Sequence, residues 1–249
     1  MKDKASKLFV ILGGFFVTNA LLAEIIGVKI FSVEETLGIE PFTFSFFGEK
    51  IEGFNMTAGV LLWPVVFVMT DIINEYFGKK GVRMLSFMTA GLILYAFLMI
   101  QAAIYVVPAE WWVVDKADVG VPDQFKAFKA IFGQGSWIIA GSIVAFLIGQ
   151  MTDVISFRYI RKFTGKKMIW LRATGSTLIS QLIDSFVVLF IAFYIGNDWS
   201  FKFVMAIALT NYIYKFVVAI LSTPLIYAVH YFIEKYLGIE KAEELAESV

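Results

Sequence analysis

Long runs of apolar residues dominate this chain and limit it to few folds. A helix needs about 20 residues to cross the hydrocarbon core of a membrane, and six runs approach or exceed that length. We predict these spans: Leu8–Val28, Thr57–Phe77, Val82–Val107, Gly133–Phe157, Met168–Ile195 and Phe201–Ile233. The last run is longer than a span, so it should tilt, kink near Pro224 or extend into the cytoplasm. The pattern predicts an all-α integral membrane protein, a bundle of six transmembrane helices.

Composition supports this class and excludes several functions. Hydrophobic residues make up 59% of the chain and charged residues 17%, against about 25% charged residues in a typical soluble domain. The formal net charge is zero, so no basic face indicates a nucleic-acid partner. The chain has no cysteine and one histidine, His230. Thiolate and His-rich metal sites are thereby excluded, and we expect neither a metal nor a cofactor.

The distribution of Lys and Arg predicts the orientation of the bundle. Of the 21 basic residues, 14 lie at the N-terminus, in the turn around Lys79, between Arg158 and Arg172, and at the C-terminus. Basic residues concentrate in cytoplasmic loops, so both termini should be cytoplasmic. We expect one six-helix transmembrane domain over residues 1–238 and a charged cytoplasmic tail over residues 239–249.

Two long connections should then lie on the outer side. Residues 30–55 mix near-alternating phenylalanines with glycine and acids, a pattern that favours a short hairpin or an interfacial flap. Residues 108–132 carry two tryptophans and four acids and should form an amphipathic stretch on the surface.

Two predicted spans carry the same polar pattern, Gln150-x-x-Asp153 and Gln181-x-x-Asp184. Residues three apart lie on one face of a helix. A charged residue at the centre of a membrane helix costs roughly 2.5–3.5 kcal/mol even on the lenient scale, so these side chains should face a partner, a cavity or a ligand. The two pairs lie on successive antiparallel spans and could form two walls of one pocket. Structural alternatives are an interhelical hydrogen bond for Asp184 and an ion pair with Arg158 or Arg161 for Asp153.

Further polar residues lie within the other predicted spans. Asp71, Asn74 and Glu75 occupy one end of the second span, and Glu75 could pair with Lys79. Asn19 lies deep in the first span.

The sixth span carries Asn211 and Lys215 on one face. Lys215 should neutralise a buried acid, Asp184 or Asp71. Trp63, which precedes Pro64, could mark a kink or provide an aromatic platform for a planar ligand. Glu24 could be an outer-gate residue or a loop anchor.

Three blocks of sequence together resemble one known family. They are Asn55–Pro64 continuing to Thr70–Lys80, then Gly149–Gln150 with Asp153, then Trp170–Arg172 with Gly175–Ser185. These blocks, in this order, are similar to the signature of the queuosine precursor transporters, also called the vitamin uptake transporter family. The segments 30–55 and 108–132 are longer than in compact members of that family.

The resemblance implies a multi-pass protein of the bacterial cytoplasmic (inner) membrane that imports 7-deazaguanine precursors such as 7-cyano-7-deazaguanine. The residue chemistry agrees with such a substrate. A carboxylate can accept two parallel N–H donors of a guanine-like edge, amide and ammonium groups can donate to its carbonyl, and aromatic rings can stack on it. The predicted substrate-binding residues are Asn19, Trp63, Asp71, Asn74, Gln150, Asp153, Gln181, Asp184, Asn211 and Lys215.

Two other classes of protein remain as alternatives. The chain could be a substrate-binding membrane subunit of a vitamin uptake system that needs a separate ATP-driven module. An intramembrane enzyme is the second alternative, but neither an HExxH nor a Gly-x-Ser-x-Gly motif occurs, and the Gln-x-x-Asp pairs give no sign of a hydrolytic aspartyl dyad. We therefore predict that the protein is not an enzyme. Glycines such as Gly13, Gly14, Gly141 and Gly149 would permit close helix approach in a homodimer.

Overall fold

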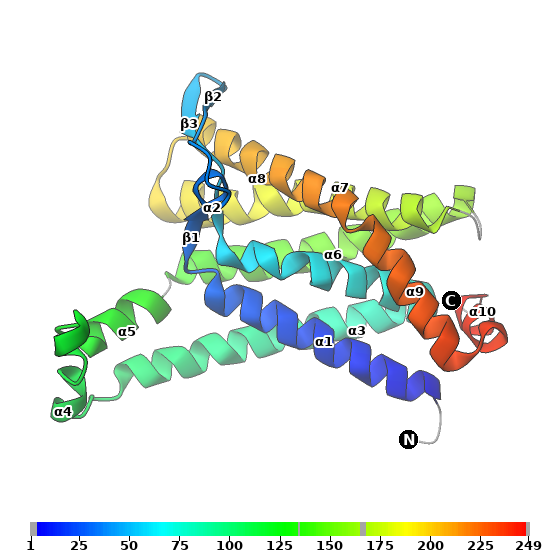
Figure 1. The fold of residues 1–249 in the computed structure, drawn as a ribbon, viewed down its shortest axis with the longest axis horizontal. Helices are drawn as coiled ribbons and strands as arrows, with labels where there is room; N and C mark the ends of the chain where they lie inside the picture. Colours follow the sequence, from blue (N-terminus) through cyan, green and yellow to red (C-terminus); the bar gives the residue numbers. More distant parts are fainter. Residues whose placement is uncertain (1–3, 134, 165–167, 248–249) are drawn as a thin grey trace.

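Five long helices form the bundle in the computed structural model, which describes residues 4–133, 135–164 and 168–247. They are α1 (Lys4–Ile26), α3 (Trp63–Tyr105), α6 (Ser136–Thr164), α7 (Ile169–Leu189) and α8 (Phe201–Leu221). A π-helical segment, Phe190–Ile195, continues α7. These helices lie side by side along the long axis of the molecule (Figure 1). Each of the five is long and apolar enough to cross a membrane. For α6, this candidate span also includes the preceding helix α5.

Helix α3 contains two of the predicted spans. It has 43 residues, and Gly78 adopts φ 64° and ψ −172° within it. At this positive φ a side chain would be strained. The chain reverses direction there, so residues before and after Gly78 form two limbs that run in opposite directions (Figure 1). The separate predicted spans 57–77 and 82–107 correspond to these two limbs. Because both limbs belong to the one helix α3, the structure has five candidate membrane-spanning helices where we predicted six spans.

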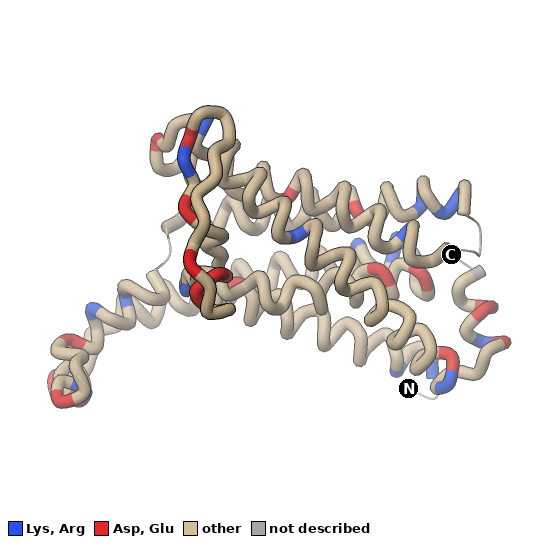
Figure 2. Tube along the Cα trace, turned by 45° about the horizontal axis from the view of Figure 1, so that its top comes forward, with Lys and Arg blue, Asp and Glu red and all other residues tan. Residues whose placement is uncertain are grey.

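The bundle has two different ends, which we call the terminal end and the hairpin end. The described chain begins in α1 and finishes in α10 at the terminal end, where α6 ends and α7 begins (Figure 1). The hairpin end carries the strands and helices α4 and α5. Charged residues gather toward both ends and are sparse along the middle of the bundle (Figure 2).

Two small antiparallel strand pairs cover the hairpin end, which confirms the hairpin predicted for residues 30–55. Strand β1 (Ile30–Ser32) pairs with β4 (Asn55–Thr57), and β2 (Thr43–Phe46) pairs with β3 (Glu49–Glu52). A short helix, α2 (Val33–Thr36), follows β1. Its Glu34 is buried and accepts two hydrogen bonds from the N–H of Phe54, which holds the loop between the strand pairs.

Residues 108–132 form a helical arm that extends away from the bundle (Figure 1). The arm contains α4 (Glu110–Val113), a 3-10 turn (Ala117–Val119) and α5 (Gln124–Phe132). Asp123 caps α5 by accepting a 2.8 Å hydrogen bond from the N–H of Lys126, and this bond lowers the pKa of the Asp123 carboxyl.

The kink expected near Pro224 is present. Helix α8 ends at Leu221, and α9 (Thr223–Leu237) begins in a new direction with Pro224 in its first turn (Figure 1). Gly238 then turns the chain at φ 91° into α10 (Ile239–Glu247). The charged tail thus includes a helix, whose Ala242 is buried in the hydrophobic core while Leu245 and Ala246 pack against it.

The hydrophobic core lies mainly where α1, α3, α6 and α9 meet. Its largest fully buried side chains include Phe16, Ile72, Ile73 and Phe157. Along the same helices many large apolar side chains are exposed, such as Phe15 and Leu98. An apolar exterior of this kind suits contact with lipid.

Candidate functional site

Helices α6 and α7 are antiparallel neighbours, and their contact brings the two Gln-x-x-Asp pairs together. Gly149 of α6 faces Asp184 of α7 at this contact, since a Cβ atom at position 149 would lie 3.6 Å from Asp184 Cβ, an ordinary van der Waals distance. Gln150, Asp153 and Gln181 are each 5% exposed. The two pairs line one small internal cavity, as the sequence predicts.

This inner cavity has a volume of about 10 Å³, close to the minimum for one water molecule. Its walls combine polar groups with aromatic rings. The lining residues are Trp63, Phe67, Thr70, Phe146, Gly149, Gln150, Asp153, Thr177, Ser180, Gln181 and Asp184. Thr70 Oγ1 lies 3.2 Å from Gln150 Oε1, which holds the Gln150 amide toward α3.

A second, outer cavity of about 410 Å³ extends from the hairpin end. Ile30 of β1, Thr57 of β4 and Ile131 of α5 contribute to its lining at that end, and Asp184 and Lys215 line it deeper in the bundle. Its volume falls within the usual range for small-molecule sites, about 300–1,000 Å³.

Trp63, Phe146 and Asp184 line both cavities and therefore form the boundary between them. The Trp63 and Phe146 rings are 6.1 Å apart between centroids. Trp63 also stacks on Phe67 at 6.0 Å with an interplanar angle of 19°. Aromatic faces thus separate the larger apolar space from the small polar one.

The Asp184 carboxylate forms an ion pair with Lys215 of α8, with 2.5 Å between Nζ and Oδ2. Both side chains are only partly exposed, 21% and 13% respectively. This contact confirms the prediction that Lys215 neutralises a buried acid and selects Asp184 as its partner.

Asp71 of α3 and Asp153 of α6 approach each other through hydroxyl groups of α7. Thr177 Oγ1 lies 3.5 Å from Asp71 Oδ2, and Ser180 Oγ lies 3.3 Å from Asp153 Oδ1. The Thr177 hydroxyl also lies beside Asp153. The predicted ion pair of Asp153 with Arg158 or Arg161 is absent from the described residues, since Arg161 instead donates to the Ala246 carbonyl and Arg158 is exposed.

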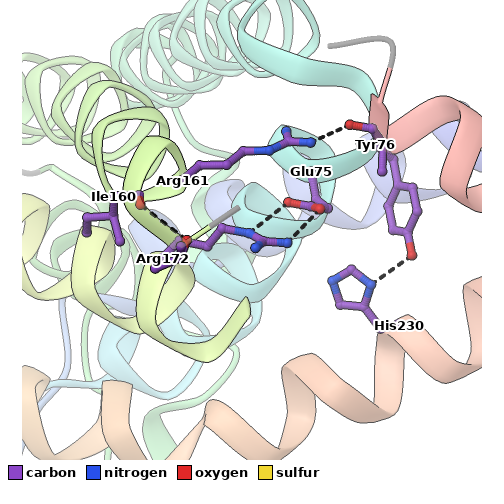
Figure 3. Close-up of polar contacts among 8 residues, drawn as sticks. Glu75, Tyr76, Ile160, Arg161, Arg172 and His230 are labelled. Atoms are coloured by element: carbon purple, nitrogen blue, oxygen red, sulfur yellow. Dashed lines mark hydrogen bonds and ion pairs between the residues drawn. The ribbon is translucent and has the colours of Figure 1, made fainter. Parts of the chain in front are cut away.

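Polar contacts close the terminal end of the bundle (Figure 3). Arg172 of α7 binds Glu75 of α3 through two hydrogen bonds of 2.8 and 3.1 Å, and both side chains are buried. The Glu75 partner suggested by the sequence, Lys79, is exposed instead. Tyr76 contacts His230 of α9 at 2.7 Å between Oη and Nδ1, and Arg161 of α6 binds the carbonyl at the end of α10.

The other predicted site residues lie at varying distances from the cavities. Asn211 lines the outer cavity. Asn74 is 2% exposed and lines neither cavity, and its two amide atoms have no hydrogen-bond partner among the residues that the structure describes. Asn19 does not line either cavity, and its amide donates to the Phe15 carbonyl of its own helix.

Several site residues were missed by sequence reasoning. Thr70, Thr177 and Ser180 contact the predicted Gln and Asp side chains, and Phe146 completes the boundary. Ser176, Thr177 and Ser180 precede Gln181 within one turn and a half of α7, and this run of small hydroxyl residues was the available signal. Glu24 accepts a 2.5 Å hydrogen bond from Ser142 and lines the outer cavity; its roles as an outer-gate residue or a loop anchor both stay predictions.

Comparison with known proteins places the chain in a family. A sequence profile described as "Putative vitamin uptake transporter" matches residues 57–229, which include all of the inner cavity lining. The chain belongs to the vitamin uptake transporter family. The resemblance noted in the sequence is therefore confirmed.

Three curated relatives carry a transporter name. The chain is 29% identical over 159 residues to the "Probable queuosine precursor transporter" of Bacillus subtilis, which covers 62% of this chain and 65% of the relative. It is 29% identical over 166 residues to the "Queuosine precursor transporter" of Escherichia coli, covering 66% and 67%. It is 28% identical over 148 residues to the "Probable queuosine precursor transporter" of Haemophilus influenzae, which covers 58% of this chain and 55% of the relative.

The chain thus matches about two thirds or less of the length of these vitamin uptake transporter relatives. No solved structure matches it. The relatives bear the names of transporters and not of enzymes, in agreement with the prediction from the sequence.

Proposed function

We propose that the protein imports a queuosine precursor, 7-cyano-7-deazaguanine or a related 7-deazaguanine base, across the cytoplasmic membrane. The observation that carries this proposal is the convergence of Gln150, Asp153, Gln181 and Asp184 on one cavity beside Trp63. This set offers carboxylate acceptors for the N–H edge of a guanine-like ring and amide donors for its carbonyl. Trp63 offers a flat face for stacking.

The inner cavity is too small for a base in this conformation, whereas the outer cavity is large enough. We infer that substrate first enters the outer cavity and contacts Trp63, Phe146 and Asp184 at its floor. Movement of the Trp63 and Phe146 rings would then join the two cavities. This movement would bring the base against the two Gln-x-x-Asp pairs.

The two ends of the bundle differ in a way that fits alternating access. At the hairpin end the outer cavity reaches into the bundle, whereas ion pairs and hydrogen bonds tie helices together at the terminal end. With both termini in the cytoplasm and the two limbs of α3 counted as separate crossings, the bundle has six spans. The structure then corresponds to a state closed toward the cytoplasm. Release of substrate would require the Glu75–Arg172 contact to open.

Uptake of labelled 7-cyano-7-deazaguanine by cells that cannot make it tests the proposal. Each neutral hydrogen bond contributes about 0.5–1.5 kcal/mol, so Gln150→Ala and Gln181→Ala should weaken apparent affinity about 2- to 10-fold. Gln101→Ala, on the exposed surface of α3, is the matched control and should transport normally.

Asp184→Asn should lower uptake more strongly, because it removes an acceptor and leaves Lys215 without its partner. Wild-type rates for correctly inserted Gln181→Ala and Asp184→Asn would refute the site assignment. Transport by the purified protein alone in proteoliposomes would exclude the rival class, a binding subunit that needs an ATP-driven module.

A further inference from the structure

Asp71 and Asp153 form a carboxyl pair inside the bundle, and their charges have no counterion among the described residues. The side chains are 3% and 5% exposed. Thr177 contacts the first and lies beside the second, so a single hydroxyl links the two acids. One oxygen of each carboxyl, Asp71 Oδ1 and Asp153 Oδ2, has no hydrogen-bond partner within the described part of the chain.

The neighbouring charged groups already have partners of their own. Glu75, on the same helix as Asp71, pairs with Arg172 of α7. Asp184 of α7 pairs with Lys215 of α8. Glu24 of α1 accepts a hydrogen bond from Ser142 beside the outer cavity. Within the described ranges, neither of the two ion pairs includes Asp71 or Asp153.

Two adjacent buried carboxylates would be very unfavourable if both were ionised. Burial of an unpaired charge has an effective penalty of several kcal/mol in proteins, and two carboxyl groups that share a site hold a proton between them because both cannot ionise together. A proton would also supply a donor for the unpartnered carboxyl oxygens. A hydrated cation would not fit, since the inner cavity beside Asp153 has room for about one water molecule.

We propose that the Asp71–Asp153 pair binds the proton that is carried inward with each substrate molecule. This inference rests on the proposed import function and adds the coupling ion to it. Asp153 lines the inner cavity, so substrate and proton can affect each other directly. Asp71 lies one helical turn from Glu75 on the same face of α3. A rearrangement that opens the Glu75–Arg172 contact would therefore expose the pair toward the terminal end and permit release of the proton.

Proteoliposomes that contain the purified protein and the trapped pH dye pyranine test this coupling. In sodium-free choline buffer, addition of external 7-cyano-7-deazaguanine should acidify the lumen. If one proton enters with each neutral molecule, the ratio of internal to external substrate should rise about tenfold for each pH unit of gradient, acid outside. Substrate entry without acidification and without a response to the pH gradient would overturn the inference while leaving the transport function intact. Strict dependence on sodium would overturn it as well.

Isosteric variants identify the residues involved. Asp71→Asn and Asp153→Asn should each lower the number of protons that enter per substrate molecule, a ratio that a merely structural defect would not change. Asp118→Asn, in the exposed arm, is the matched control and should keep the wild-type ratio. Unchanged ratios in both core variants would contradict the assignment of the pair.

Infrared spectroscopy gives a readout that does not depend on the identity of the substrate. Difference spectra of the purified protein between neutral and alkaline pH should show the C=O band of a buried protonated carboxyl. The double variant Asp71→Asn/Asp153→Asn should lose a large part of this band, and Asp118→Asn should retain all of it. A band of wild-type intensity in the double variant would overturn the inference. If the band behaves as expected but labelled precursor fails to enter the vesicles, the proton site stands and the transport proposal fails.

Discussion

Removal of one partner from the Glu75–Arg172 ion pair should strongly destabilise the terminal end of the bundle. The two side chains are 7% and 3% exposed and are joined by hydrogen bonds of 2.8 and 3.1 Å. Loss of one member of a buried pair leaves the other charge without compensation, which typically costs about 3–5 kcal/mol. For a domain of this size, that corresponds to about 6–20 °C in unfolding temperature.

The perturbation is Arg172→Met, which removes the guanidinium and keeps an apolar side chain of similar length. Thermal unfolding of purified protein in a single detergent provides the measurement. Arg158→Met, at the same end of the bundle but exposed, is the control and should change stability by less than about 0.5 kcal/mol.

A double-mutant cycle separates loss of the pair from loss of packing. Glu75→Leu/Arg172→Met replaces both charges with apolar groups, a change that is often neutral for buried pairs. The double variant should therefore be more stable than the sum of its single variants predicts, by about 0.5–3 kcal/mol. Additive single effects, or an Arg172→Met variant as stable as Arg158→Met, would refute the argument that this ion pair closes the bundle.

Other predictions test the aromatic boundary, the helix contacts and the terminal closure. Trp63→Ala should weaken precursor binding about 5- to 150-fold, because stacking on an aromatic ring contributes about 1–3 kcal/mol per base. Titration of the purified protein with the precursor measures this change, and an unchanged dissociation constant would contradict the stacking role. Gly59→Ala should destabilise the protein by about 1–3 kcal/mol and lower its unfolding temperature, since the new Cβ would lie 2.5 Å from the Ala23 carbonyl oxygen. Gly91→Ala, within α3 and with open space around it, should not lower the unfolding temperature and should raise it slightly, because alanine favours a helix over glycine. A stop codon after Gly238 removes α10 and its contact with Arg161. In this truncated protein, a cysteine introduced at Ser176 should react faster with an aqueous thiol reagent, because the terminal end is more open to water. Equal labelling of the truncated and full-length proteins would contradict a closing role for α10.

Much of the helical organisation could be predicted because it follows from local patterns. Apolar runs of spanning length predicted the helices, Pro224 indicated the position of a kink, and near-alternating aromatic residues favoured the hairpin. Gly78 was harder to interpret, because it allows the chain to reverse without an intervening loop. Two predicted spans consequently belong to one continuous helical element. The helical arm over residues 110–132 was expected only as an amphipathic surface stretch.

The candidate site was predicted unevenly, and the reason is physical. Gln150, Asp153, Gln181 and Asp184 stood out because buried amides and carboxylates are costly in an apolar helix. Serine and threonine carry no such cost, since a hydroxyl can donate to a carbonyl of its own helix, as Ser180 does to Thr177. Such residues do not stand out in a sequence, yet the same hydroxyls can contact neighbouring helices.

Charge pairing, too, could be predicted only in part from the sequence. The sequence indicated that Lys215 would neutralise an acid, but helix packing was needed to choose Asp184 over Asp71. Asp71 is then left without a cationic partner in the described ranges, and it approaches Asp153 across Thr177. If Lys215 had instead contacted Asp71, a proton on the carboxyl pair would be unnecessary for charge balance. The partner of Lys215 therefore determines whether the bundle holds a carboxyl pair that can carry a proton, and exchange of Asp184 and Lys215 for a neutral pair should leave that proton site in place.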